Sequence, residues 1–240
     1  MIKLLDNKSW NKDDLIQRMY DDSFYYGYLG KVALSSSSIK SLYSNPKMYY
    51  KDLDKDISNI PAIRMGALTH TLILEPDKIK SDYHFVDIGS RRTKAFENEA
   101  FENQSKKVML ASELEEAMNL KDYIDLDEAS IYFEDGEAEV PQIGSLFGMP
   151  FRCKADYKKT ELLSDLKTTS NISNWEYDAR HKYHYDIQDY IYTSLFGYKR
   201  MVFVIIDKNT FEVDTFEFTE EDRRIAGLKL QIAIHNFKSL

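Results

Sequence analysis

Asp156, Asp165 and Lys167 are the residues of this sequence whose types and spacing could do chemistry together. Residues 151–169 are typical of two short strands joined by a polar turn. Side chains alternate between the two faces of a strand, so Asp165 and Lys167 point the same way and Leu166 points the other way. An acid and an amine held side by side on a rigid strand can bind a metal ion and help to activate water.

Asp156 joins this pair through the geometry of the turn. With residues 159–160 at the centre of a two-residue turn, Asp156 lies opposite Leu163, and residues directly opposite each other share a face of the sheet. Two carboxylates on one face suit Mg²⁺ or Mn²⁺, which prefer oxygen ligands. The alternative is a solvated acid–lysine pair on an edge strand, because a chain with 32 basic and 40 acidic residues contains such triplets by chance.

His70 is the histidine that could complete this site. It lies in a mostly buried helix over residues 62–75, which Pro76 ends, and Gly66 shares its face because the two residues are four apart. Glycine lowers helix stability, so we expect another backbone to approach closely where His70 points. A lone histidine in an apolar helix is more often a core residue with its hydrogen bonds satisfied. His70 becomes a candidate ligand only as a fourth member of the site formed by the two acids and the lysine.

A further helix places two phenols and an amide on one stripe. It begins at residues 174–175 and ends near Gly197, and Tyr185, Gln188 and Tyr192 follow its periodicity. Such a stripe is unusual for a core, and it suits a groove that positions a phosphate or stacks a base. The alternative is buried tyrosine rings with hydrated hydroxyl groups.

Serines 35–38 open a helix whose apolar positions are Ile39, Leu42 and Tyr43, and Asn45–Pro46 ends it. The serine hydroxyls and the free N–H groups of the first turn can hold a phosphate. Simple capping of the helix is the alternative for each serine.

The composition describes a globular protein with a sizeable core. The 240 residues are 43% hydrophobic, with 9 Gly and 5 Pro, and fit one large domain or one domain with a helical appendage. No apolar run could span a bilayer, and the N-terminus lacks a signal-peptide core. A single cysteine, Cys153, forms no internal disulfide and no four-cysteine metal site, so we expect a reducing cytoplasm.

The net charge of −8 counts against non-specific nucleic-acid binding, which depends on neutralising phosphates. Charge is local, however, and cations bound at a carboxylate-lined site would offset it. Small basic clusters at residues 91–94 and 106–107 fall within a helical stretch over residues 88–122. That stretch is read equally well as a solvated helical face or as an insert that contacts phosphates.

The other segments predict helices and strands around the hairpin. Residues 1–30 read as a helical arm, with Asn11 or Asp13 as the cap of its helix. The last helix begins with the capping arrangement at residues 219–222 and runs through Ile234. Strands are expected at residues 81–87, 128–133, 200–206 and 211–218, with an acidic turn at residues 134–136 and then a linker that reaches Gly148.

Taken in order, these motifs resemble the RecB/RecE-like, exonuclease VIII-type branch of phage exonucleases in the PD-(D/E)xK nuclease superfamily. The resemblance runs from residue 34 to residue 206, and the joint match is specific although each piece is weak. It rests on Leu-Ser-x-Ser at 34–37, Gly-x-x-x-His at 66–70, Glu-x-Ser at 128–130, Lys-Ala-Asp at 154–156, Asp-Leu-Lys-Thr-Thr at 165–169 and Gln-x-x-x-Tyr at 188–192.

The resemblance implies an α/β (α+β) fold with a restriction-endonuclease-like core, in which helices flank a central mixed sheet. A helical arm over residues 1–30 would precede a single nuclease domain at 31–240 with a helical insert at about 88–122. Relatives with an iron–sulfur cluster carry cysteines near the position of Asn45–Pro46 and near the C-terminus. This chain has none there, so we expect no cluster.

The resemblance also implies roles for the residues. Asp156, Asp165 and Lys167 would be catalytic, and Lys167 would orient or deprotonate the attacking water. One or two Mg²⁺ or Mn²⁺ ions would be held by His70, Asp156, Asp165 and the backbone carbonyl of Leu166. Residues that bind or position the nucleic acid would be Gln188, Tyr192, Tyr185, Ser35, Ser37 and Glu128.

The activity so implied is a metal-dependent DNA exonuclease that hydrolyses phosphodiester bonds from DNA ends in phage recombination or DNA degradation. It would act on DNA in the cytoplasm of a host, away from membranes. A single-strand annealing protein and further copies of the chain, closed into a ring, are the partners that the resemblance suggests. The rival interpretations are a single-strand-specific exonuclease, an endonuclease on the same core, and a catalytically silent DNA-binding protein.

Overall fold

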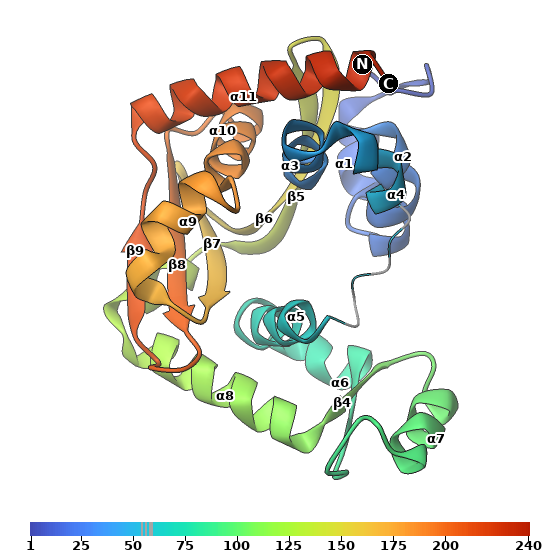
Figure 1. Ribbon diagram of the computed structural model, residues 1–240, viewed down its shortest axis with the longest axis vertical. Helices are drawn as coiled ribbons and strands as arrows, with labels where there is room; N and C mark the ends of the chain where they lie inside the picture. The colour runs from blue at the N-terminus through green and yellow to red at the C-terminus, as the bar shows by residue number, and fades with distance from the viewer. Residues whose placement is uncertain (54, 56, 58–59) are drawn as a thin grey trace.

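A five-stranded mixed sheet forms the centre of the computed structural model, which describes residues 1–53, 55, 57 and 60–240 (Figure 1). Strands β7 and β8 are parallel, and the other neighbours in the sheet are antiparallel. In spatial order, the strands are β5 (Glu137–Leu146), β6 (Met149–Lys159), β7 (Leu162–Thr169), β8 (Arg200–Asp207) and β9 (Val213–Phe216).

Helices cover both faces of this sheet, and β8 shows how the sequence produces the two layers. The odd-numbered residues of β8, including Phe203, pack in one core cluster with residues of α3 (Ser36–Ser44), α10 (Tyr185–Phe196) and α11 (Glu220–Lys238). The even-numbered residues of β8 pack on the other face, in a second cluster with Leu120 and Ile124 of α8 (Ala111–Leu126). A strand buried on both faces is therefore apolar throughout, as residues 200–206 predicted. The expected α/β fold with helices around a mixed sheet is confirmed.

The hairpin of β6 and β7 turns one residue later than predicted. Lys159 pairs with Leu162, so residues 160–161 form the turn, and continuing the register sets Asp156 opposite Asp165 instead of Leu163. The predicted pairing was wrong by two residues along the partner strand. Because side chains alternate with a period of two, this shift keeps the same residues on the same face.

The N-terminal arm is helical only in part. Helix α1 (Lys12–Arg18) has Asn11 as its cap, as predicted, and is followed by a π-helix, η1 (Ser23–Tyr28), and by α2 (Leu29–Val32). Two short antiparallel strands, β1 (Ile2–Lys3) and β2 (Ser9–Trp10), precede it and were not predicted. Pairs of two residues are too short to give a periodic signal in the sequence.

Helix α5 (Pro61–Leu74) confirms the predicted helix that carries Gly66 and His70. The expected reason for Gly66 was wrong: a Cβ atom there would meet the side-chain Oγ1 of Thr168 at 3.8 Å, an ordinary contact, and not another backbone. Short elements flank α5 on either side, namely the 3-10 helices η2 (Pro46–Met48) and η3 (Pro76–Lys78) and helices α4 (Tyr49–Leu53) and α6 (Ile79–Asp82).

The segment after α5 is mainly helical, with α7 (Lys94–Glu102) and α8. Strand β3 (Tyr83–Val86) was predicted, but its parallel partner β4 (Lys107–Leu110) was not. The predicted strand at 128–133 was wrong, because this run forms a 3-10 helix, η4 (Glu128–Phe133), whose first turn is capped by the Asp127 carboxylate. The predicted linker was wrong as well, because β5 occupies most of it.

The helix predicted from 174 to 196 is interrupted. A 3-10 turn, η5 (Ile172–Asn174), leads into α9 (Trp175–His181), and α10 starts anew at Tyr185. His184 between them has a left-handed backbone with φ 49° and its Nδ1 contacts the Arg180 carbonyl at 3.1 Å. Within the part of the chain that is described, no helix is both long and apolar enough to cross a membrane.

Helix α11 offers a test of this packing. Leu230 is fully buried in the core cluster that α11 shares with α3 and α10, whereas Leu228 of the same helix is 48% exposed. Leu230→Ala should lower the free energy of unfolding by about 2–5 kcal/mol, because it removes buried methyl groups and leaves a cavity. Leu228→Ala should change it by less than about 0.5 kcal/mol. Urea unfolding followed by circular dichroism measures both, and equal effects of the two variants would contradict the placement of α11.

Candidate active site

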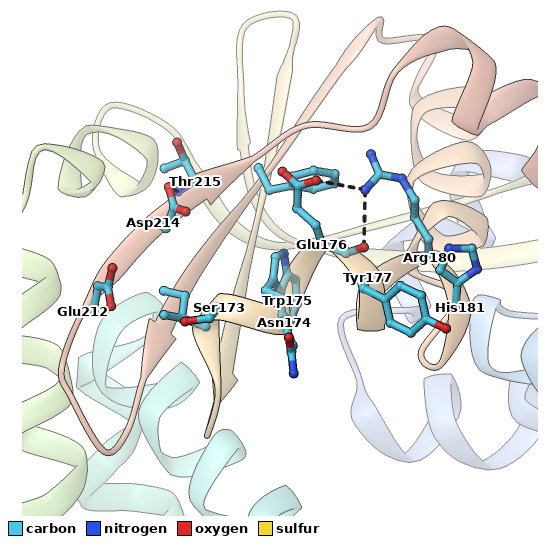
Figure 2. Close-up of a pocket in the computed structure, with 12 residues that line it drawn as sticks. Ser173, Asn174, Trp175, Glu176, Tyr177, Arg180, His181, Glu212, Asp214 and Thr215 are labelled. Carbon is cyan, nitrogen blue, oxygen red and sulfur yellow. Dashed lines mark hydrogen bonds and ion pairs between the residues drawn. The ribbon is translucent and has the colours of Figure 1, made fainter.

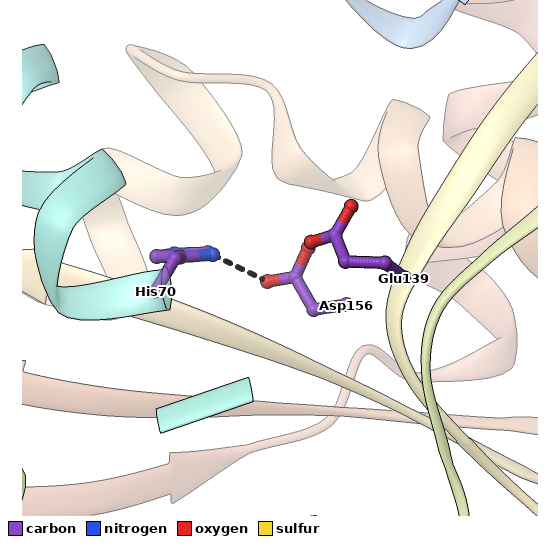
Figure 3. Close-up of side chains that lie close together, drawn as sticks. All are labelled: His70, Glu139 and Asp156. Carbon is purple, nitrogen blue, oxygen red and sulfur yellow. Dashed lines mark ion pairs between the residues drawn. The ribbon is translucent and has the colours of Figure 1, made fainter. Parts of the chain in front are cut away.

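Three side chains from three elements meet at one edge of the central sheet. His70 comes from α5, Glu139 from β5 and Asp156 from β6, and one ligand atom of each lies within 4.8 Å of the others (Figure 3). The Nδ1 atom of His70 lies 3.3 Å from Oδ2 of Asp156, and the Glu139 carboxylate lies beside that of Asp156. One imidazole nitrogen and two carboxylates form a ligand set for a divalent metal ion.

The orientation of His70 is set by a backbone group of β7. Its Nε2 atom lies 2.8 Å from the carbonyl oxygen of Leu166. A carbonyl can only accept a hydrogen bond, so Nε2 carries the proton in this contact, and in the neutral imidazole Nδ1 then has the lone pair. That lone pair is available on the side of Asp156 and Glu139, which is the arrangement in which an outer hydrogen bond prepares a histidine to bind a metal. The resemblance assigned the Leu166 carbonyl to the metal, and here it contacts His70.

The separation of β6 from β7 makes room for these groups. The two strands pair from the turn back to Tyr157 and Ser164 and no further. Beyond that point, the backbone N–H of Leu166 donates to Oδ2 of Asp156 at 2.9 Å. The Asp156 carboxylate thus takes the place of a strand carbonyl, and the buried N–H group keeps a partner.

Glu139 was missed by the sequence reasoning. The β5–β6 pairs run from Ala138 with Tyr157 directly to Val140 with Ala155, so Glu139 and Asp156 face each other without pairing. Glu139 has a left-handed backbone with φ 53°, which is uncommon for a residue with a side chain and is found where the surrounding structure imposes it. Burial and then the Asp156 charge raise the pKa of Glu139 to about 8, although Lys154 opposes the shift.

Asp165 and Lys167 lie on one face of β7, as the alternation predicted, and form an ion pair. Asp165 is fully buried, and the amide of Gln188 donates to its Oδ1. Burial, with the nearby Asp156 charge, raises the pKa of Asp165 to about 6, while Lys167 opposes the rise. For Lys167, burial favours loss of the proton, but the Asp165 and Asp156 carboxylates outweigh it, so its pKa lies above the usual value.

All of these groups line one cavity of about 790 Å³. Its walls come from η1, α3, α5, α10 and the sheet, and it brings together most of the residues that the sequence singled out. These are Ser35, Ser37, His70, Asp156, Asp165, Lys167, Tyr185, Gln188 and Tyr192. Glu128 is exposed on η4 and does not line the cavity, so the structure does not bring it to the site.

Lys40 is a cavity residue that the sequence reasoning did not single out. Its Nζ lies 4.2 Å from the centre of the Tyr185 ring, and Lys167 Nζ lies 5.0 Å from the same ring. Burial and then the Lys167 charge lower the pKa of Lys40 to about 7. Lys40 lies four residues after Ser36 and therefore on the same face of α3, and this spacing was the signal available in the sequence.

The sequence of the chain matches the model of a family described as a PDDEXK-like domain of unknown function (DUF3799) over residues 35–237. The chain belongs to this family. It is therefore a member of the PD-(D/E)xK nuclease superfamily, as its motifs indicated, and the cavity that holds Asp156, Asp165 and Lys167 is the candidate active site of this PDDEXK-like domain.

Solved structures support the fold of this PDDEXK-like domain. The chain superposes on the crystal structure of a candidate exonuclease from Eubacterium rectale with a TM-score of 0.65 and 16% sequence identity, covering 91% of this chain and 86% of the other. The structure of SSO0001 gives a TM-score of 0.33 at 14% identity, over 74% of this chain and 87% of that one, which is too low to carry an argument. No curated protein matches the sequence.

The donor set of the PDDEXK-like site fits a divalent cation. His70 offers a nitrogen lone pair, Glu139 and Asp156 offer carboxylate oxygens, and the buried Oδ2 of Asp165 has no hydrogen-bond partner among the described residues beyond its ion-pair contact with Lys167. Hard oxygen donors with one imidazole suit Mg²⁺ or Mn²⁺, and the imidazole favours Mn²⁺. Holding the acids ionised so close together requires a cation between them.

A second hollow of about 550 Å³ lies between α9 and β9 (Figure 2). Arg180 bonds the carboxylate and the carbonyl of Glu176 there, each at 3.3 Å. Glu212 and Asp214 line the opposite wall. No residue predicted to act on the substrate lines this hollow, so the nuclease chemistry belongs to the larger cavity.

Metal binding by this PDDEXK-like domain should release protons. With its pKa near 8 in the metal-free protein, Glu139 is mostly protonated at neutral pH, and a divalent ion needs the carboxylate. The affinity for Mn²⁺ should therefore rise as the pH goes from about 6 to about 8 and then level off.

Calorimetry in buffers of different ionisation enthalpy measures the proton release directly. Glu139→Gln should bind Mn²⁺ at least about tenfold more weakly, and its metal binding should no longer release protons. Glu137→Gln, on the exposed end of the same strand, is the matched control. An affinity that does not change with pH would contradict the placement of Glu139 at the metal.

Proposed function

We propose that this chain is a divalent-metal-dependent exodeoxyribonuclease, which hydrolyses phosphodiester bonds from DNA ends. The observation that carries the proposal is the buried Asp165–Lys167 pair beside His70, Glu139 and Asp156 in one cavity. Acids that can hold a cation, next to an ammonium group in a site shielded from water, are the parts that phosphodiester hydrolysis needs. The fold shared with the candidate exonuclease supports the same proposal.

In this proposal His70, Glu139, Asp156 and Asp165 hold the ion. A divalent ion bound there would supply a hydroxide nucleophile and offset the charge of the scissile phosphate. Lys167 retains its proton, because two carboxylates raise its pKa, so it offsets charge in the phosphoryl transition state and does not act as the base. Gln188 positions Asp165 through its amide.

The walls of the cavity support action at ends. The N-terminal arm contributes Asp22, Tyr25 and Tyr26 on one side, and α5 contributes Gly66, Ala67 and His70 on another. A site bounded by several elements admits the end of a strand more readily than an uninterrupted duplex. Ser35 and Ser37 offer hydroxyl groups for a phosphate. The Tyr185 ring lies at the wall of the cavity below Lys40 and Lys167, and Tyr192 is a core residue that borders the cavity.

The wider roles follow from the resemblance of the motifs. We propose residues 31–240 as the nuclease domain, with residues 1–30 as an arm that contributes to its cavity. The biological setting proposed is DNA recombination or degradation by a phage in the cytoplasm of its host. A single-strand annealing protein and a homo-oligomer that encloses DNA are the partners in that setting.

Degradation of defined DNA substrates tests the activity. The purified chain should shorten linear duplex DNA when Mn²⁺ or Mg²⁺ is present, stop when a chelator is added, and leave a covalently closed circle intact. Loss of linear single strands alone would assign a single-strand exonuclease, and cutting of the circle would assign an endonuclease. A chain that cleaves none of the three with either metal would be a DNA-binding protein, and the proposed activity would be wrong.

Lys167→Ala should reduce cleavage about a hundred- to a thousandfold while leaving the binding of Mn²⁺ and DNA largely intact, since a transition-state charge is lost. Lys158→Ala, which removes a lysine of the same hairpin that pairs with Glu137 outside the cavity, is the matched control. Circular dichroism and urea unfolding report on folding. If Lys167→Ala no longer unfolds cooperatively and Asp165→Asn/Lys167→Ala recovers, Lys167 serves structure and the catalytic assignment fails.

A further inference from the structure

The charges that line the main cavity fall into pairs, with a few exceptions. Lys154 is paired with Asp22 at 2.7 Å, Lys78 with Glu75 at 2.7 Å, and Lys167 with Asp165. Lys154 also lies 3.9 Å from Glu139, which with Asp156 and His70 belongs to the metal ligand set described above. The cations left over are the groups for which this protein offers no carboxylate, and they indicate where an anion from outside would bind.

Arg152 and Lys40 are the cations among these that lie shielded from water, and Arg152 is the more buried side chain. Arg152 lies on β6, is only 8% exposed and lines the cavity, and its Nε has no hydrogen-bond partner among the described residues. Its guanidinium lies 4.3 Å from the centre of the Tyr25 ring. No ion pair joins Arg152 to a carboxylate in the part of the chain that the structure describes, and its other close contacts there are with uncharged groups.

Several cations shielded from water in this fold have a carboxylate partner, and Arg152 and Lys40 have none among the described residues. Lys229 is paired with Asp186 at 2.7 Å, and Arg223 is paired with the buried Asp189. Arg91 is paired with Glu113 at 2.7 Å. Burial of an ion without a partner is unfavourable, and proteins retain such a group where a ligand completes it. Arg152 departs from the pattern at the wall of the cavity, where a ligand could reach it.

The position of Arg152 separates it from the metal ligands. Its backbone N–H donates to the Leu34 carbonyl at 2.8 Å, which joins this part of β6 to the chain just before α3. A Cβ atom on Gly30 of α2 would lie 3.7 Å from Nη2 of Arg152, and Tyr25 belongs to η1. The guanidinium therefore faces the N-terminal arm, whereas His70 reaches the metal site from α5, which lies away from that arm in Figure 1.

We propose that Arg152 binds a backbone phosphate of the DNA strand at a subsite distinct from the one where the strand is cleaved. A guanidinium presents a planar fork of N–H donors that matches two oxygens of a phosphate, and it binds this group more specifically than an ammonium does. The inference rests on the proposed function, because it takes DNA as the ligand. It adds a residue that fixes the register of the strand relative to the metal.

Binding measurements in a cleavage-deficient background test the proposal. Asp156→Asn protein, with Arg152 either intact or changed to Met, is titrated into a dye-labelled oligonucleotide over a series of salt concentrations. Arg152→Met should weaken binding about ten- to a hundredfold, since a charged hydrogen bond is lost. It should also reduce the slope of log affinity against log salt by about 0.7–0.9, which corresponds to one phosphate contact.

Arg18→Met is the matched control. Arg18 is an exposed arginine of the N-terminal arm that stacks on Trp10 at 5.2 Å and does not line the cavity. It should leave both the affinity and the slope unchanged. Arg152→Lys keeps the positive charge but lacks the planar set of guanidinium N–H donors. It should therefore keep the slope of log affinity against log salt and recover part of the affinity.

Oligonucleotides with one neutral methylphosphonate linkage locate the contact. In the protein with Arg152 intact, binding should weaken when the neutral linkage stands at one particular position, and that position should differ from the one that is cleaved. In Arg152→Met, a neutral linkage at the same position should have no further effect. An Arg152→Met protein that binds with the affinity and slope of Arg18→Met would overturn the inference. Failure of the background protein with Arg152 intact to bind any DNA would instead overturn the proposed function.

Urea unfolding of the free proteins completes the test. Removal of an uncompensated buried charge should leave the unfolding midpoint of Arg152→Met equal to or above that of the wild type. A structural role would lower this midpoint and leave the salt slope of binding unchanged, and that combination would also overturn the inference.

Discussion

The separation of strands β6 and β7 beyond Tyr157 and Ser164 is the constraint on which the site depends. Two adjacent strands normally satisfy each other's backbone groups, and strands that separate leave donors and acceptors unpaired. Here the Asp156 carboxylate receives the Leu166 N–H, and His70 contacts the Leu166 carbonyl. The side chains of Asp156 and His70 therefore replace the missing part of the ladder, so the opening in the sheet is maintained by the groups that it exposes.

Charge explains why such a site can exist in a folded protein. Asp165 is buried with Lys167 at hand, and the repulsion from Asp156 and the loss of water still raise its pKa to about 6. The acidic side of the cavity holds Glu139 and Asp156 close together, and the basic side holds Arg152 without a carboxylate partner among the described residues. A cation and a phosphate are the ligands that would complete the two sides, so binding of both would be coupled through the same cavity.

Local alternation made the acid–lysine pair predictable from sequence. Even with the wrong turn, Asp156, Asp165 and Lys167 fell on one face, because an error of two residues preserves the face. Glu139 could not be found in this way, because it stands in a segment with turn residues at both ends and has a left-handed backbone that interrupts its strand pairing. The partner of Gln188 is set by the packing of α10 on β7, which no local pattern encodes.

His70 links the site to the second helical layer. Its helix is held against α8 by the contacts of Arg64 with Glu113, a residue that also bonds Arg91 and the backbone N–H of Leu110. Leu68, on the same helix, packs with Met109 of β4 and Ala117 of α8. The segment between α5 and the central sheet, which reads in sequence as an accessory insert, thus holds the helix that carries His70, the proposed nitrogen ligand. A loss of packing in that segment would move His70 before it disturbed the sheet, so the proposed metal site is more sensitive to this layer than the fold is.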